Sequence, residues 1–391
     1  MEITREKACR CALNRIFGFE PKIASALISH LGSATEVFSL TPHETDLLLG
    51  PHSKYRGRLT PTAVDEAVCE LERLAREGIY FVGHGEAGYP PLLDECEDAP
   101  AGLYIRSSSL PENLWKRRRF ISVVGTRDLS PYGREWCERI IRRLSELHDR
   151  DRPVIVSGLA IGTDACAHRT ALASGLPTIA VMATGPETIY PGRHRSLAED
   201  ICGAQDSALM TDYPPGTAPL AVHFLRRNRL IAGISEATIL VESKIKGGGM
   251  MTARLADSYN RTVFALPGRI DDLRSQGCNH LISSRIATPI TSLEKFLKEI
   301  GISDRKRDRK ESDSDRIESL YKGVVPDDRI SQMSAILLAI RSERGITLEE
   351  IAMKTELDYS RVSQLAGMLE TDGVITRDLL QRCFINFTKP R

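Results

Sequence analysis

The chain has 391 residues, which is enough for two or three domains with a sizeable core. Charged residues make up 27% and hydrophobic residues 41%, a balance that excludes an intrinsically disordered chain. The 53 lysines and arginines against 52 aspartates and glutamates leave a net charge of +1, which excludes a globally basic, histone-like protein. A local basic patch stays compatible with this value, because net charge says nothing about distribution.

Nothing in the sequence indicates a membrane or secretory protein. No stretch is long and apolar enough to span a bilayer, and residues 1–6 contain no apolar signal region. The nine cysteines include no C-x-x-C pair, so neither a metal site nor a redox motif is expected. These features predict a cytoplasmic protein.

Residues 1–75 are predicted to form a small helical domain. Apolar side chains recur there at near-helical spacing, Gly18 and Gly32 separate short helices, and Thr41-Pro42 is typical of a helix start. Short helices joined by glycine turns fit a helix-hairpin-helix or SAM-like module. They fit any other small helical cap equally well.

Residues 76–300 show a different pattern, in which short β-branched runs alternate with helical stretches. The runs are apolar on both faces, which is typical of buried parallel strands, and most gaps can hold a crossover helix. A doubly wound α/β sheet follows, with its ligand expected at the carboxyl ends of the strands. The six predicted strands are residues 120–124, 154–156, 178–182, 208–211, 238–241 and 262–265.

Residues 301–327 are predicted to be a charged linker, because they contain too few apolar side chains to fold. Residues 328–391 predict three helices followed by a hairpin, the plan of a winged-helix domain. Thr347 and Glu350 form a capping box at the start of the second helix. The third helix carries only Arg361 as a cation able to reach a base, so a partner-binding or structural role is at least as well supported as DNA binding.

Four glycine-bearing turns are expected at or near strand ends. Glycine lets backbone N–H groups approach an anion, and a following helix N-terminus adds partial positive charge. Tight turns between strands and helices need glycine anyway, but four on one edge favour a phosphate-binding rim. The turns are residues 124–127, 157–164, 183–192 and 246–252.

The most distinctive segment is Phe224-Leu225-Arg226-Arg227-Asn228-Arg229. We expect it at the start of a helix near the rim, where arginines could pair with phosphates and the aromatic ring could stack on a base. The alternative is a structural ion-pair cluster with Asp212 or Glu242.

Motifs of common enzymes are missing. There is no G-x-G-x-x-G turn and no G-x-x-x-x-G-K-S/T loop, so neither a dinucleotide cofactor nor P-loop hydrolysis is predicted. Ser157 does not sit in a nucleophile elbow. Asp164 and His168 share a helix face without a third partner, so we interpret Asp164 as a helix cap and His168 as a hydrogen-bonding residue.

Taken together, these motifs resemble the DNA-processing protein A family (DprA, also called Smf) over residues 89–290. The matching positions are Tyr89-Pro90-x-Leu92, Val123-Val124-Gly125-Thr126-Arg127, Tyr132-Gly133, Ser157-Gly158-Leu159-Ala160-x-Gly162-x-Asp164-x-x-Ala167-His168, Tyr190-Pro191, Arg227-Asn228-Arg229-x-Ile231-Ala232-Gly233, Thr252-Ala253, Pro267-Gly268 and Gly277-x-Asn279-x-Leu281-Ile282.

The resemblance implies an extended Rossmann-like domain between helical and winged-helix modules. It implies a non-enzymatic protein that binds single-stranded DNA, protects incoming strands during natural transformation and loads the RecA recombinase. A homodimer through the Rossmann-like domain is also implied. The DNA-binding residues carried over are Arg127, Ser157, Gly158, Gly162, Thr163, Phe224, Arg226, Arg227, Asn228, Arg229, Gly247, Gly248, Gly249 and Thr252.

The chain departs from the family pattern in several turns. Gly162-Thr163-Asp164 replaces Gly-Ile-Asp, Gly247-Gly248-Gly249 replaces Ser-Gly-Ser, Thr211-Asp212 replaces Ser-Glu, and Arg285-Ile286-Ala287 stands where Gly-Ala is usual. The lost serine hydroxyls predict weaker phosphate contacts.

Two other functions stay open. One is a nucleotide-hydrolysing enzyme like the phosphoribohydrolases, whose P-G-G-x-G-T-x-x-E motif supplies a catalytic glutamate. Leu255 occupies the glutamate position here, which argues against that enzyme. The other is a scaffold that mainly recruits a recombinase.

Overall fold

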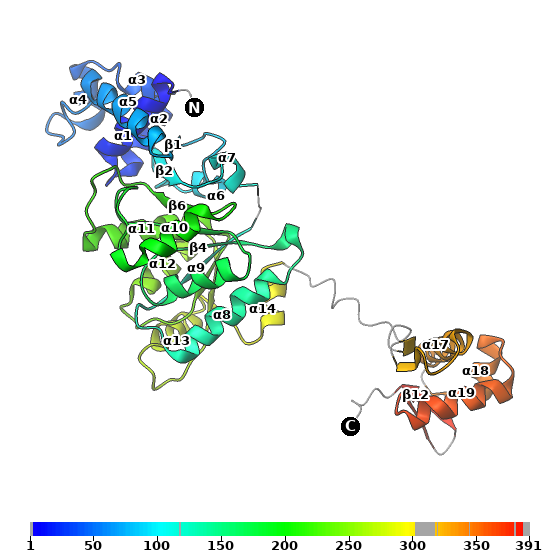
Figure 1. Ribbon diagram of the computed structural model, residues 1–391. Coiled ribbons are helices and arrows are strands. Elements are labelled where there is room, and N and C mark those ends of the chain that lie inside the picture. The colour runs from blue at the N-terminus through cyan, green and yellow to red at the C-terminus, as the bar shows by residue number, and fades with distance from the viewer. Residues whose placement is uncertain are drawn as a thin grey trace. The chain divides into compact units, whose positions relative to one another are not determined.

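The structure, a computed structural model, describes residues 3–116, 119–301, 317–318, 320–343, 345–378 and 381–385. Contacts divide the chain into two compact units, Met1–Ile302 and Ser303–Arg391 (Figure 1). Most of the charged stretch in the predicted linker, residues 302–316, lies outside the described residues.

The first unit opens with five helices, as the glycine and Thr-Pro signals predict. Gly18 and Gly32 follow the ends of the first two helices, and Thr41 forms a capping box with Glu44. These helices share a hydrophobic core with Phe81 of the first strand, so they pack directly onto the sheet. A helix-hairpin-helix or SAM-like assignment stays a prediction. The helices are α1 (Arg5–Phe17), α2 (Pro21–Leu31), α3 (Ala34–Val37), α4 (Pro42–Leu49) and α5 (Pro61–Arg76).

A nine-stranded sheet forms the centre of this unit, in the order β1-β2-β6-β5-β4-β3-β7-β8-β9. All six predicted strands are present to within a residue at either end. The sequence missed β1, β2 and β9, and the sheet is not wholly parallel, because β1 and β2 run antiparallel at one edge. The strands are β1 (Ile79–Gly83), β2 (Gly102–Arg106), β3 (Phe120–Val124), β4 (Val154–Ser157), β5 (Thr178–Val181), β6 (Ala208–Thr211), β7 (Ala237–Leu240), β8 (Thr262–Ala265) and β9 (Thr288–Pro289).

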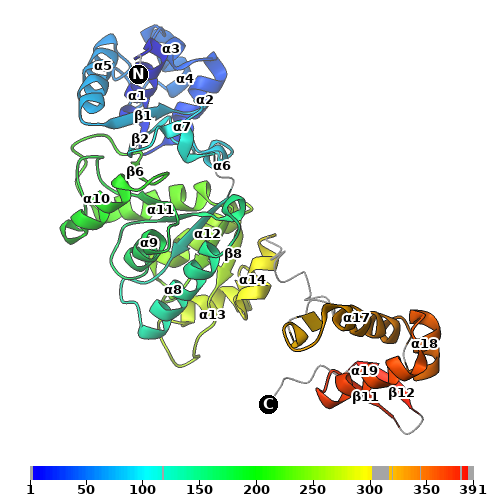
Figure 2. The same ribbon diagram turned by 45° about the vertical axis from the view of Figure 1, so that its right-hand side comes forward.

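Helices cover both faces of the sheet and make three layers (Figures 1 and 2). Successive side chains of a strand point to opposite faces, so Phe120 and Val124 join one core while Ile121 and Val123 join the other. Helices α11, α12 and α13 cover the first face, and α8, α9 and α14 cover the second. The remaining segments of this unit are α6 (Pro91–Asp94), α7 (Pro111–Leu114), α8 (Pro131–Ser145), η1 (Asp149–Asp151), α9 (Thr163–Ala173), η2 (Gly192–His194), α10 (Arg195–Gly203), α11 (Ala221–Ile234), α12 (Gly248–Ser258), α13 (Gln276–Ser283) and α14 (Leu293–Glu299).

The order of the strands creates a switch point between β3 and β7. The chain leaves β3 for β4 on one side, whereas it leaves β7 for β8 on the other side. The connections therefore diverge at the carboxyl ends of these two neighbouring strands. Such a divergence opens a crevice, which is where α/β sheets bind their ligands.

The second unit contains the three predicted helices and the predicted hairpin, around one apolar core. Thr347 and Glu350 form the predicted capping box, and a short strand at Ile346 adds a third member to the sheet. Arg361 donates to Gln332 of the first helix at 2.9 Å. The winged-helix assignment stays a prediction. The segments are α17 (Asp327–Ser342), β10 (Ile346–Thr347), α18 (Leu348–Thr355), α19 (Tyr359–Thr371), β11 (Ile375–Arg377) and β12 (Arg382–Ile385).

Within the described part of the chain, no helix has both the length and the apolar character needed to cross a membrane.

Candidate functional site

A cavity of about 720 Å³ lies at the switch point. Its walls come from the turn after β3, the turn after β4, one face of α11 and the glycine turn that follows β7. All four glycine turns seen in the sequence thus contribute to one cavity, the third of them through Tyr190. Predicted site residues that line it are Arg127, Phe224, Arg227, Asn228, Gly247, Gly248, Gly249 and Thr252.

The structure separates the other predicted residues from this cavity. Arg226 and Arg229 line a neighbouring cavity of about 450 Å³, and Gly162 lines a third cavity. The helical period explains the division, because residues 224, 227 and 228 share one face of α11 while residues 226 and 229 point elsewhere. The cluster also lies within α11 rather than at its start, since the helix begins at Ala221.

Ser157 and Thr163 shape the neighbouring turns and do not line the cavity. The Ser157 hydroxyl donates to the Val123 carbonyl at 2.6 Å, and the Thr163 hydroxyl donates to the Thr126 carbonyl at 3.1 Å. Both side chains are fully buried. Their hydroxyls are therefore committed to the protein backbone.

Arg227 is a buried cation at the floor of the cavity, with 4% of the residue exposed. Its guanidinium donates to the carbonyls of Gly158 and Val181, and so joins the ends of β4 and β5 to α11. A Cβ added at Gly158 would lie 2.4 Å from the Arg227 Nη1 atom, so any larger residue there would displace the guanidinium. Burial lowers the pKa of Arg227, and the nearby Asp164 carboxylate opposes that shift.

Arg229 forms a structural ion pair, which was the alternative interpretation of the arginine cluster in the sequence. It pairs with Asp212 and donates to the Asp98 carbonyl at 2.6 Å. Arg226 is exposed, stacks 4.6 Å above the Phe19 ring and donates to the Phe19 carbonyl at 3.0 Å. This face of α11 therefore contacts the turn between α1 and α2.

The mouth of the large cavity combines cations with aromatic rings. The Arg127 guanidinium lies 5.4 Å from the centre of the Phe224 ring. The centres of the Tyr190 and Phe224 rings are 5.5 Å apart, and the two rings pack edge to face. Lys244 and Lys246 are exposed and complete the lining after β7. Among the described residues, Arg127 and both lysines have no ion-pair partner.

The sequence prediction of site residues omitted Tyr190, Lys244 and Lys246. Tyr190 belongs to the third glycine turn, Lys246 is the first residue of the fourth, and Lys244 lies two residues before it. Two lysines spaced i and i+2 at the end of a buried strand were the available signal, because the carboxyl end of that strand was already expected to face a ligand.

The Asp164–His168 pair is structural. The Thr178 hydroxyl donates to the Ile155 carbonyl, so it accepts the hydrogen bond from His168 Nδ1 at 2.7 Å. This confirms the hydrogen-bonding role of His168. Burial, reinforced by the positive charge of Arg227, lowers the pKa of His168 to about 3.

Asp164 differs from the expectation, because Gly162 and not Asp164 occupies the position that caps α9. The Asp164 carboxylate instead accepts from the Ala160 backbone N–H, at 3.3 Å. Among the described residues, no three His, Cys, Asp or Glu side chains are grouped so that they could hold a metal ion.

These features define an α/β protein with a large, mostly parallel sheet and a cation-rimmed crevice suited to a phosphate-bearing ligand. Comparison with known proteins identifies the family. The sequence model of DNA recombination-mediator protein A matches residues 80–301, and the chain belongs to this family. The resemblance seen in the motifs is thereby confirmed.

Relatives match beyond the sheet. Protein Smf of Synechocystis is 31% identical over 328 residues, which cover 79% of this chain and 80% of the relative. The X-ray structure of DNA processing protein A from Streptococcus pneumoniae has a TM-score of 0.59 at 30% identity and covers 76% of this chain and 99% of its own. The Helicobacter pylori protein, solved to study its single-stranded DNA binding mode, has a TM-score of 0.50 at 27% identity, covering 57% and 95%.

Proposed function

We propose that this protein binds single-stranded DNA in the cavity at the switch point and acts as a mediator of recombination. The observation that carries the proposal is the mouth of that cavity. Arg127 lies 5.4 Å from the centre of the Phe224 ring, and Arg127, Lys244 and Lys246 line the cavity without an ion-pair partner among the described residues. A site for single-stranded DNA combines cations, which pair with the phosphates, with accessible aromatic rings, on which the bases stack.

The division of labour follows from chemistry. The exposed cations pair with phosphates, while Phe224 and Tyr190 offer ring surface to a base. The Asn228 side-chain amide lines the same cavity and forms no hydrogen bond with a described residue, so it is available to a sugar or a base edge. Phosphate contacts and stacking carry little sequence information, so binding is sequence-tolerant and falls with salt.

The finer role includes protection of incoming strands, delivery of a RecA-type recombinase and a homodimer. Support comes from the family description of a recombination mediator and from relatives that carry the name DNA processing protein DprA. The second unit then serves as a winged-helix module that contacts a partner. Catalysis has no part in this proposal, and Leu255 stands where the rival phosphoribohydrolase motif needs its glutamate.

Fluorescence anisotropy with a labelled mixed-sequence strand tests the proposal, using unlabelled duplex and a nucleoside monophosphate as competitors. We expect the labelled strand to bind with an affinity that falls with salt. Unlabelled single strand should displace it, whereas duplex and nucleoside monophosphate should displace it poorly. Arg127→Ala should weaken binding of the labelled strand, whereas Arg73→Ala, which removes an exposed arginine from α5, should not.

Two results contradict the proposal. One is strand binding that Arg127→Ala leaves unchanged in a folded variant. The other is release of base from the monophosphate by the wild-type protein, lost when Arg127 is replaced, which would favour the enzyme instead.

A further inference from the structure

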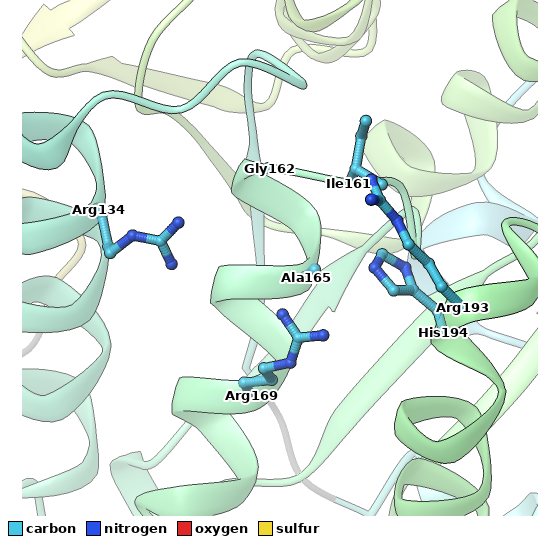
Figure 3. A pocket seen from close by; sticks show the side chains of 7 residues that line it. All are labelled: Arg134, Ile161, Gly162, Ala165, Arg169, Arg193 and His194. Carbon is cyan, nitrogen blue, oxygen red and sulfur yellow. The ribbon is translucent and has the colours of Figure 1, made fainter.

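Three arginines line the third cavity, which has a volume of about 220 Å³ and also contains Gly162 in its wall. Arg134 comes from α8, Arg169 from α9 and Arg193 from η2, so the tertiary fold brings them together (Figure 3). Figure 3 shows their side chains arranged around the first turns of α9. The other lining residues are Ile161, Gly162, Ala165 and His194.

These arginines differ from their neighbours in lacking counter-charges. The other arginines of α8 all pair with glutamates, and Glu138, one turn from Arg134, is taken by Arg142 at 2.8 Å. No carboxylate lines the cavity, and none of the three arginines has an ion pair with a described residue. Gathering like charges without an acid is unfavourable, and a bound anion would relieve the repulsion.

The rest of the lining is compatible with an anion. Gly162 precedes the 11 residues of α9, whose first backbone N–H groups carry partial positive charge. His194 is held by a hydrogen bond between its Nδ1 and the Leu159 carbonyl at 2.8 Å. The volume lies below the roughly 300–1,000 Å³ typical of sites for drug-sized ligands, so the cavity suits a compact group such as a single phosphate.

This cavity and the large one share two turns. In the turn after β4, Ala160 lines the large cavity whereas Ile161 and Gly162 line the small one. In the turn before α10, Tyr190 lines the large cavity whereas Arg193 lines the small one. The two cavities therefore lie on either side of the same turns.

We propose that Arg134, Arg169 and Arg193 bind a phosphate group of the strand beyond the portion held in the large cavity. This inference rests on the proposed function and lengthens the stretch of single-stranded DNA that the protein contacts. A strand must be long enough to pass over the shared turns before it reaches the arginines, so their contribution depends on length.

The test compares oligothymidylates of about 5 and about 20 nucleotides, a range that spans common single-strand site sizes. The variant is Arg169→Ala with Arg193→Ala, and the control is Arg139→Ala with Arg142→Ala, which removes the same charge from α8. We expect the variant to lose several-fold affinity for the long strand only, with a salt slope reduced by about 0.7 for one phosphate. The control should bind both strands as the wild type does.

The outcomes separate the two proposals. If Arg127→Ala weakens both strands but the variant keeps the wild-type affinity and slope for the long one, the arginine site is refuted and the proposed function stands. If the wild-type protein binds neither strand, both fail. Calorimetry with inorganic phosphate tests a free-anion site, and phosphate binding that the variant loses without any change in strand binding overturns the strand assignment. Circular dichroism checks that each variant is folded.

Discussion

Two groups of cations lie around the same end of the sheet, and they do different work. Arg227 and Arg229 are buried in α11, where Arg227 donates to two carbonyls and Arg229 donates to a carbonyl and pairs with Asp212. Arg127, Lys244 and Lys246 stand at the mouth of the cavity, exposed and without ion pairs among the described residues. Two of the three arginines in the α11 cluster thus hold parts of the protein together, while the exposed cations come from separate turns.

Desolvation explains this division. Removing a cation from water costs several kcal/mol, and the protein offsets that cost only by supplying hydrogen bonds and an acid. Donors used in this way are no longer available to a phosphate. Exposed cations stay hydrated until a ligand arrives, so they can exchange water for phosphate.

The largest effect should come from breaking the buried pair. Arg229→Ala leaves Asp212 buried without its partner, and we expect the free energy of unfolding to fall by about 3–5 kcal/mol. Arg127→Ala should change it by less than about 0.5 kcal/mol, as is usual for an exposed residue. Urea denaturation measures both values.

A double variant separates the charge from the packing. Arg229→Met with Asp212→Ala removes both charges and should recover part of the lost stability. Similar small losses in Arg229→Ala and Arg127→Ala would break the comparison between buried and exposed cations.

The ring at the cavity mouth should have the next largest effect. Phe224→Ala is expected to weaken single-strand binding by about 1–3 kcal/mol, the usual contribution of a base stacked on an aromatic side chain. Leu225→Ala is the matched control, because Leu225 lines the same cavity and is exposed but has no ring. Anisotropy titrations give both affinities, and equal losses would indicate apolar contact without stacking.

The protonation of His168 measures whether the buried surroundings of Arg227 accept a second positive charge. Its pKa is lowered to about 3 from 6.5, so below pH 6.5 the unfolded chain takes up a proton that the folded protein refuses. The contribution of His168 is fully present above pH 6.5 and is lost as the pH falls, by up to about 1.4 kcal/mol per pH unit.

His168→Gln removes this proton uptake. Denaturation curves between about pH 5 and 6.5 should therefore show a shallower pH dependence of stability in the variant than in the wild type. Identical slopes would mean that His168 is protonated in the folded protein, and that positive charge is accepted there without a partner.

The smallest effect is expected from a single exposed lysine. Lys246→Ala should reduce the salt slope of strand binding by about 0.7 and leave the melting temperature unchanged. Lys298→Ala removes an exposed lysine of α14 and serves as the control. A lowered melting temperature with an unchanged salt slope of strand binding would mean that Lys246 stabilises the fold, as the buried arginines do, and does not contact the strand.

Much of the fold could be predicted from local patterns. Six parallel strands are buried on both faces, so each is a short apolar run bounded by turn residues. The strands β1, β2 and β9, which lie at or next to the edges of the sheet, were missed because their pairing depends on distant segments, as in the antiparallel contact of Tyr104 with Thr211. A short segment such as Thr288–Pro289 is a strand only because β8 lies beside it.

The sequence by itself determined the parallel strands, the glycine turns at their ends and the motifs that mark the family, because each depends on residues close together in the chain. Only the tertiary structure decided which cations remain open to a ligand. Arg227 and Arg229 are two residues apart, yet the helical period points them into different surroundings with different partners. Arg134, Arg169 and Arg193 are far apart in the chain, yet packing of α8, α9 and η2 places them around one cavity. Burial and partner choice are long-range properties, and they determine whether an arginine supports the fold or remains available to a phosphate.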